Sequence, residues 1–199
     1  MSTLGTSSPR RIAIIGGHIP RECGIATFTT DLAASLSIAY PDADVFVVAL
    51  NDNDVGYDYP ERVRFEINQD DLSSYRRAAE YLNYTGVDVV CLQHEFGIFG
   101  GPAGAHILSL LGQLSMPVVT TLHTIERNPS RDQQRVLARL IQRSQRLVVM
   151  STLGQRMLQA TCRVPDAKLD FIPHGTPTWG SWTRAFTRTS STLRARSSC

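Results

Sequence analysis

Four of the five histidines directly follow, or lie just beyond, apolar stretches that predict buried strands. These histidines are His18, His94, His123 and His174. The carboxyl ends of parallel strands share one rim of the sheet, and open α/β sheets bind their ligands at that rim. We therefore expect the four imidazoles to face one crevice, where they could contact a substrate or hold a metal ion.

The spacing of these histidines argues against a metal site. The sequence contains no His-Glu-x-x-His and no His-x-His pattern, and the four histidines belong to separate predicted loops. Metal sites that can be recognised in a sequence use such local pairs. We predict no metal ligand. Cys23 precedes a predicted helix, where a thiolate is favoured, so it is either a nucleophile or a small packed residue.

A glycine-rich segment, residues 16–24, joins the first predicted strand to the first long helix. Gly16, Gly17 and Gly24 allow backbone N–H groups to approach a phosphate, and a helix N-terminus adds partial positive charge. Arg21 could supply a charged donor. The spacing matches neither G-x-G-x-x-G nor the P-loop, so a phosphate-binding loop and a plain sharp turn both stay open.

The apolar run 87–92 is typical of a strand buried on both faces of a parallel sheet. Gln93, His94 and Glu95 follow it, which places three polar side chains at the carboxyl end of that strand. Ligand binding there and an ordinary hydrogen-bonded connection are both compatible with the pattern.

Gly100 and Gly101 come next, and Pro102 after them predicts a helix start, because proline at the first helical position loses no needed N–H. The helix itself is predicted over residues 105–111. The apolar Ile98 and Phe99 before it are expected to lie uncovered at the strand-end rim.

Strand and helix patterns alternate along the whole chain. The predicted strands are residues 11–15, 44–50, 63–67, 87–92, 117–122, 147–150 and 168–173. The predicted helices are residues 25–39, 72–82, 105–111, 130–144 and 153–158, the last capped by Ser151 or Thr152. This order predicts an α/β fold with a doubly wound parallel sheet. The polar alternation in 63–67 predicts an exposed or edge strand.

Composition fits a single soluble domain of 199 residues, with 42% hydrophobic and 19% charged residues. The net charge of +2 predicts no general nucleic-acid footprint. Residues 1–11 lack the apolar core of a signal peptide, no apolar run approaches the length of a membrane span, and no C-x-x-C pair occurs. We expect a cytoplasmic protein with free thiols, and membrane association is not evident.

Several motifs resemble the amino-terminal domain of family 4 glycosyltransferases. They are Pro20–Phe28, Gln93–Gly101, Thr120–Thr124 and Ile172–Gly175, of which Gln93–Gly101 is the most specific. The similarity covers residues 11–175 and implies a Rossmann-like domain, the amino-terminal half of a GT-B fold. It also implies sugar transfer with retention from a nucleotide-sugar donor to a carbohydrate or lipid-linked acceptor, with no other cofactor.

The resemblance assigns roles to individual residues. It implies that His123 lies beside the donor sugar at the reaction centre. It implies that the loop carrying Gly16, Gly17, Arg21 and Gly24 approaches the donor diphosphate. The acceptor side would be lined by His94, Glu95, Gly100 and Gly101. Family members commonly have Asp after the histidine, whereas this chain has Thr124, which leaves the local network open.

The family's donor-binding domain carries two glutamates eight positions apart, and no two glutamates of this sequence have that spacing. Residues 176–199 contain four arginines and no acidic residue. We expect residues 1–10 and this basic tail to be disordered, and the chain to be a truncated, weakly active product or one with a genuine short tail. The alternative functions are a stand-alone binding half-domain that pairs with a separate donor-domain chain and, less favoured, a metal-dependent hydrolase.

Overall fold

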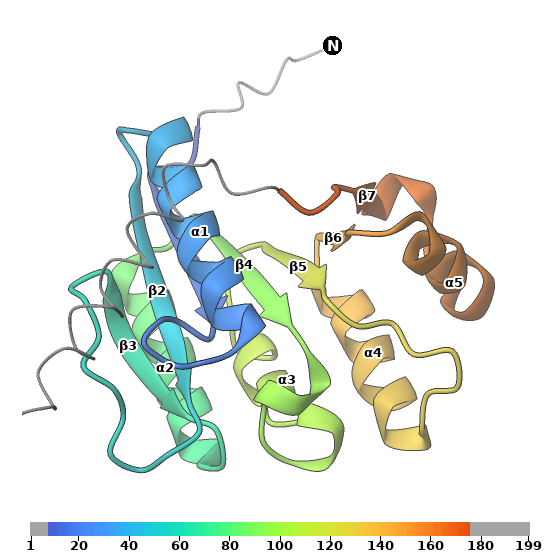
Figure 1. Cartoon of the computed structure of the whole chain (residues 1–199), viewed down its shortest axis with the longest axis horizontal. Coiled ribbons are helices and arrows are strands. Elements are labelled where there is room, and N and C mark those ends of the chain that lie inside the picture. Colours follow the sequence, from blue (N-terminus) through green and yellow to red (C-terminus); the bar gives the residue numbers. More distant parts are fainter. Residues whose placement is uncertain (1–7, 176–199) are drawn as a thin grey trace, which may run out of the picture.

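The computed structural model describes residues 8–175, which form a seven-stranded parallel sheet in the order β3-β2-β1-β4-β5-β6-β7 (Figure 1). The strands are β1 Arg11–Gly16, β2 Asp44–Asn51, β3 Val63–Asn68, β4 Val89–His94, β5 Val118–Leu122, β6 Arg146–Val149 and β7 Leu169–Phe171. The predicted α/β class and parallel sheet are confirmed. The disorder predicted for residues 1–7 and 176–199 lies outside the described residues.

The domain begins one residue earlier than the sequence pattern indicates. Arg10 was assigned to the disordered N-terminus, yet its N–H donates to Asp88 Oδ2 over 2.7 Å and its carbonyl accepts the N–H of Asp44 at 2.8 Å. These bonds extend the sheet pairing beyond Arg11, where the apolar pattern starts.

Helices cover both faces of the sheet. They are α1 Gly24–Ala39, α2 Leu72–Thr85, α3 Ile107–Leu111, α4 Arg131–Arg143 and α5 Thr152–Cys162. Of these, only α1 packs on the face formed by Ile12, Ile14, Val45 and Val47, in front of the sheet in Figure 1. The other described helices contribute to a larger apolar cluster on the opposite face. Alternate strand residues feed the two clusters, which explains why the central strands are apolar throughout.

Local signals explain two helix starts and the edge strand. Ser130 and Gln133 form a reciprocal capping box at α4, and Ser151 accepts the N–H of Gly154 at 3.0 Å to cap α5, as predicted. β3 lies at the edge of the sheet, in agreement with its polar alternation.

The helix predicted from Pro102 is interrupted. Pro102–Gly104 form a 3₁₀ turn in which Ala103 has φ 52° and Gly104 has φ 76°, so an α-helix cannot continue through them. The N–H of His106 instead donates to the carbonyl of Gly100 over 3.0 Å, and α3 begins only at Ile107. The proline therefore starts a turn rather than the α-helix.

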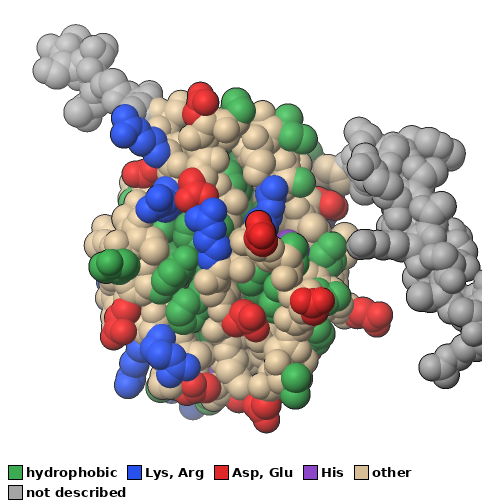
Figure 2. Space-filling view, turned by 90° about the vertical axis from the view of Figure 1, so that its left-hand side faces the viewer, with side chains coloured by type: hydrophobic (Ala, Val, Ile, Leu, Met, Phe, Trp, Pro, Cys, Tyr) green, Lys and Arg blue, Asp and Glu red, His purple; other side chains and the backbone are tan. Residues whose placement is uncertain are grey.

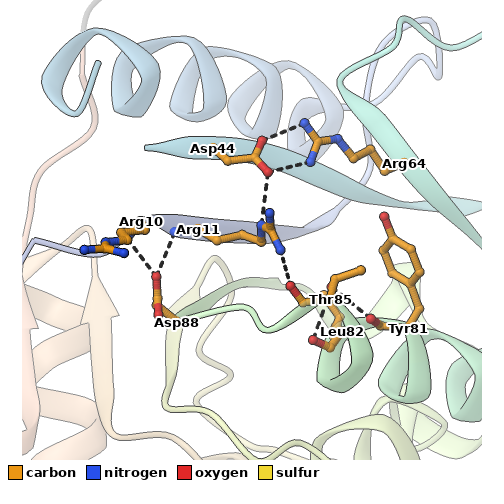
Figure 3. A network of polar contacts seen from close by, with 8 residues as sticks. All are labelled: Arg10, Arg11, Asp44, Arg64, Tyr81, Leu82, Thr85 and Asp88. Atoms are coloured by element: carbon orange, nitrogen blue, oxygen red, sulfur yellow. Dashed lines mark hydrogen bonds and ion pairs between the residues drawn. The ribbon is translucent and has the colours of Figure 1, made fainter. Parts of the chain in front are cut away.

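The edge of the sheet opposite the strand carboxyl ends is held by an ionic network (Figure 3). Asp44 of β2 binds Arg64 of β3 through both carboxylate oxygens, at 2.7 and 2.6 Å, and accepts Arg11 Nε of β1 at 3.1 Å. Arg11 also donates to the carbonyl of Thr85 at the end of α2. Hydrogen bonding to Arg64 is the main reason that the pKa of Asp44 lies below its usual value. The network thus joins three strands and a helix end.

The side of the molecule on which β3 lies carries basic and acidic side chains interspersed with apolar ones (Figure 2). Charge of both signs, rather than a continuous basic patch, covers this face of the described residues. No helix within residues 8–175 has the length and apolar character needed to cross a membrane.

Candidate functional site

The strand order reverses between β1 and β4. From β1 the chain moves outward to β2 and β3, and from β4 it moves the opposite way to β7. The crevice beyond the strand carboxyl ends at such a reversal is the usual ligand site of open α/β sheets. Gly16 ends β1 there, and a Cβ built on it would lie 3.1 Å from Gln93 Cβ and 2.6 Å from Thr29 Oγ1. A glycine at this position lets α1 and β4 approach each other.

His123 follows β5 at this edge and is held at both its backbone and its ring. Its N–H donates to the carbonyl of His94 over 3.0 Å, which continues the β4–β5 pairing by one residue. Its ring Nε2 lies 3.1 Å from Gln93 Oε1. Phe28 of α1 packs edge-on against the ring, with 4.8 Å between ring centroids.

Two histidines of the site are neutral near pH 7. Burial lowers the pKa of His123 to about 4, with His174 adding to this effect and Glu95 opposing it. Burial, followed by the neighbouring His123, lowers the pKa of His94 to about 3. His123 therefore presents uncharged imidazole rather than imidazolium to the crevice.

His94 lies beneath the surface of the site. Its side chain is 0% exposed, stacks on Phe99 with an interplanar angle of 17° and meets the edge of Phe96. Neither ring nitrogen has a hydrogen-bond partner among residues 8–175. His94 therefore supports the neighbouring loop and His123 and does not itself form the surface of the crevice.

Two hollows adjoin at His123 and His174. One, of about 410 Å³, lies against the N-terminus of α1 and is also lined by Gly24, Ile25, Thr27, Phe28 and Asp31. The other, of about 190 Å³, lies against the start of α5 and is also lined by Ile125, Met150, Ser151 and Met157. His123 thus stands between two hollows, each of which lies at the N-terminus of a helix.

His18 takes a different direction from the other three predicted histidines. Its ring approaches Tyr59 in the loop after β2, with 6.1 Å between centroids, and its Nδ1 lies 2.6 Å from the carbonyl of Ile19. Burial is the main reason that the pKa of His18 is lowered. The structure therefore groups His94, His123 and His174, and it places His18 beside Tyr59.

The glycine-rich segment ends at the hollow beside α1. Cys23 is the N-cap residue of this helix, and its Sγ accepts the N–H of Ala26 at 3.3 Å. Of the two alternatives for Cys23, this contact favours a structural role. A Cβ on Gly17 would lie 3.3 Å from Ala26 Cβ, whereas a Cβ on Gly24 would meet nothing within 4 Å. Gly24 is therefore the residue at which a ligand can come close to the helix N-terminus.

Arg21 points away from the α1 hollow. The residue is 7% exposed, its Nη1 donates to the carbonyl of Leu50 over 2.8 Å, and its Nη2 lies 3.5 Å from Gln69 Oε1. Its Nε lies 3.3 Å from Asp52 Oδ2 without hydrogen-bond geometry. These contacts hold the glycine-rich segment against the end of β2.

The predicted acceptor residues lie in the loop after β4. Glu95 accepts the N–H of Gly97 at 3.2 Å. Gly100 is buried, and its N–H donates to Tyr75 Oη over 3.1 Å, while Gly101 has φ 78° and packs against the ring of His106. The two glycines therefore shape a tightly packed turn.

Ile98 and Phe99 were expected to lie uncovered, and this expectation is wrong. They are 7% and 3% exposed, because the loop after β4 folds back into the core beside α3 and α4. The hypothesis of a stand-alone binding half-domain was based on an exposed apolar rim formed by these two residues. In the structure both residues are buried.

Sequence reasoning placed Gln93 at the ligand-binding end of a strand without giving it a partner, and it did not connect Phe28 with the site. Gln93 stood in the polar triplet beside His94, but only the pairing of β4 with β5 brings its side chain to His123. Phe28 lies within the helix predicted over residues 25–39, and no pattern in the sequence connects it with the histidines. Within residues 8–175, no three His, Cys, Asp or Glu side chains are grouped so that they could hold a metal ion.

One comparison with a solved structure agrees with this architecture. The chain is similar to a solved chain of sucrose-phosphate synthase from Thermosynechococcus elongatus, with a TM-score of 0.51, 17% identity, and coverage of 93% of this chain and 99% of that one. A weaker likeness, with a TM-score of 0.41 and 12% identity, links 72% of this chain to 53% of L-threonine 3-dehydrogenase from Trypanosoma brucei. The comparison with curated proteins found no match.

At such identities, the first structural likeness shows the fold alone. The sequence comparison is more specific, because the model of the family described as Glycosyltransferase Family 4 matches residues 23–179. This match spans well over half of the chain and includes the segments that form the α1 hollow, His123 and His174. The protein belongs to glycosyltransferase family 4.

Proposed function

We propose that this domain forms the acceptor side of a glycosyltransferase that transfers a sugar, with retention, from a nucleotide-sugar donor to a carbohydrate or lipid-linked acceptor. The observation that carries the proposal is the position of His123 between two hollows at the strand-order reversal. The family membership of the chain supports the class of reaction. The remaining donor contacts belong to a facing domain, in the same polypeptide or in a separate chain.

In this proposal the donor diphosphate lies at the N-terminus of α1. Gly16 and Gly17 bring the backbone close to α1, and Gly24 lines the hollow without a side chain to obstruct it. Backbone N–H groups and the partial positive charge of the helix then stabilise the departing diphosphate. Arg21 contributes indirectly, because its hydrogen bond to the carbonyl of Leu50 holds the glycine-rich loop in place.

The sugar lies beside His123 and the acceptor beside Glu95. The carboxylate of Glu95 is half-buried and close enough to His123 to affect the pKa of that histidine. His94, Gly100 and Gly101 contribute by supporting and shaping the loop that carries Glu95. Catalysis then consists of positioning and electrostatic stabilisation, without a covalent role for Cys23.

A substitution at Gly24 tests this position of the diphosphate. An aspartate there would stabilise the helix N-terminus, but its carboxylate would repel a bound diphosphate. The chain is titrated with UDP, UDP-glucose, GDP-mannose and inorganic pyrophosphate by calorimetry and by amide NMR. We expect weak binding that perturbs the amides of Gly17, Gly24 and His123. Gly24→Asp should abolish the binding, whereas Gly24→Asn, of equal size and without charge, should reduce it less.

Two results would count against the proposal. One is that none of these ligands perturbs the α1 hollow at millimolar concentration. The other is that the Asp and Asn variants bind equally well. Micromolar affinity of the domain alone would contradict the assignment of most donor contacts to a facing domain.

A further inference from the structure

One ring nitrogen of His123 contacts a side chain of the protein, and the other has no hydrogen-bond partner among residues 8–175. Nε2 lies 3.1 Å from Gln93 Oε1, and Gln93 is 1% exposed. Nδ1 makes no hydrogen bond to any residue between 8 and 175. The ring itself lines both hollows.

Gln93 has little freedom to move. Its Cβ and Cγ would lie 3.1 and 3.3 Å from a Cβ on Gly16, so β1 confines the side chain from one side. The backbone N–H of His123 is bound to the carbonyl of His94, and Phe28 lies edge-on to the ring. Both partners of the Gln93–His123 contact are therefore fixed before any ligand arrives.

We propose that Gln93 is the positioning residue of His123: its side-chain carbonyl accepts the Nε2–H, which fixes the neutral tautomer and leaves the Nδ1 lone pair as the acceptor for a hydroxyl in the adjoining hollows. The tautomer of a histidine is set by the hydrogen bond at its other nitrogen. A carbonyl oxygen can only accept, so Nε2 must carry the proton.

The surroundings favour the neutral ring. Burial lowers the pKa of His123 to about 4, and this outweighs the opposing influence of Glu95. The other titratable groups around the ring are His94 at the end of β4, His174 beyond β7 and Asp31 of α1, which lines the same hollow. On its other side, α5 contributes the uncharged Ser151 and Met157.

A neutral acceptor at Nδ1 binds the proton of a hydroxyl group and gives no charge stabilisation to a phosphate. His123 therefore selects for a hydroxyl-bearing part of the ligand. The diphosphate is left to the backbone of α1. The identification of that hydroxyl as one of the donor sugar rests on the proposed function, whereas the tautomer and its cause do not.

The test uses the ligand-free chain, so it is independent of whether any nucleotide sugar binds. Two-dimensional ¹H–¹⁵N NMR of ¹⁵N-histidine-labelled protein reports which ring nitrogen carries the proton. We expect His123 to be neutral and protonated at Nε2 from about pH 5.5 to pH 8, given a pKa of about 4. Protonation at Nδ1, or an imidazolium at pH 6, would overturn the proposal.

The contact with Gln93 is tested by Gln93→Glu. A carboxylate at hydrogen-bond distance keeps the Nε2–H tautomer and should raise the pKa of His123 by about one unit or more. Gln113→Glu is the matched control, since it adds the same charge at an exposed site near the start of β5, beside Asn83. Equal pKa values of His123 in the two variants would show that Gln93 does not contact the ring. The wild-type tautomer can be measured even if Gln93→Glu does not fold.

Discussion

Gln93 Oε1 on β4 and His123 Nε2 beyond β5 lie 3.1 Å apart although 30 positions separate the two residues in the chain. The pairing of β4 with β5 in parallel register brings them together. On the other side of Gln93, Gly16 leaves the space that its side chain needs. The edge of the sheet that carries His123 is thus built by three neighbouring strands, β1, β4 and β5.

The space at Gly16 predicts a stability effect. In Gly16→Ala, the new methyl group would lie 2.6 Å from Thr29 Oγ1 and 3.1 Å from Gln93 Cβ. We expect this overpacking to lower the free energy of unfolding by about 1–3 kcal/mol, measured by urea denaturation. Gly24→Ala is the control and should change stability by less than about 0.5 kcal/mol, since its Cβ meets nothing within 4 Å. Equal stability of the two variants would contradict this packing.

The cap at Cys23 predicts a difference between two small substitutions. Cys23→Ala removes the acceptor for the N–H of Ala26 and should lower the free energy of unfolding by about 0.5–1 kcal/mol. Cys23→Ser replaces a weak acceptor with a favoured N-cap oxygen and should leave stability unchanged or higher. Thermal and urea denaturation of both variants measure this. A Ser variant less stable than the Ala variant would rule out the capping role.

The burial of His94 predicts a loss of stability on acidification. Its folded-state pKa of about 3 lies below the ordinary value of 6.5, so between these values the unfolded chain binds a proton that the folded chain does not. The full stability is present above about pH 6.5 and declines as the pH falls. His94→Phe should reduce the slope of unfolding free energy against pH by about 1 kcal/mol per unit between pH 5 and 6. Parallel slopes of variant and wild type would show that His94 titrates as an exposed histidine.

The buried contacts of Arg21 predict that its carbonyl bond matters more than its ion pair. Arg21→Met leaves the carbonyl of Leu50 without its donor and should destabilise the fold by about 1–3 kcal/mol. Asp52 is exposed, so Asp52→Asn should cost less than about 1 kcal/mol. Urea denaturation of both variants provides the comparison. A larger loss for Asp52→Asn would mean that the ion pair holds the loop.

Much of the fold could be predicted because local and global signals agree. The alternation in residues 63–67 predicted an edge strand, and the serine before α5 predicted its cap. The left-handed φ of 52° at Ala103 could not be predicted, because alanine does not favour this conformation and the residue type therefore gives no signal for it.

The site was only partly predictable for a related reason. The position of His123 at a strand end follows from periodicity, but the direction of a side chain depends on its tertiary neighbours. His18 turns to Tyr59, and the loop after β4 buries Phe99, through contacts between segments distant in sequence. Gln93 acquires its partner only when two strands take their register.

The ionic ties of Asp44 to Arg11 and Arg64 lie at one end of the strands, and the histidines and hollows lie at the other. The ionic network therefore uses none of the residues that surround His123. Such a separation favours evolvability, because insertions or substitutions in the loops around His123 can change what the hollows bind while the ionic network keeps the strands together.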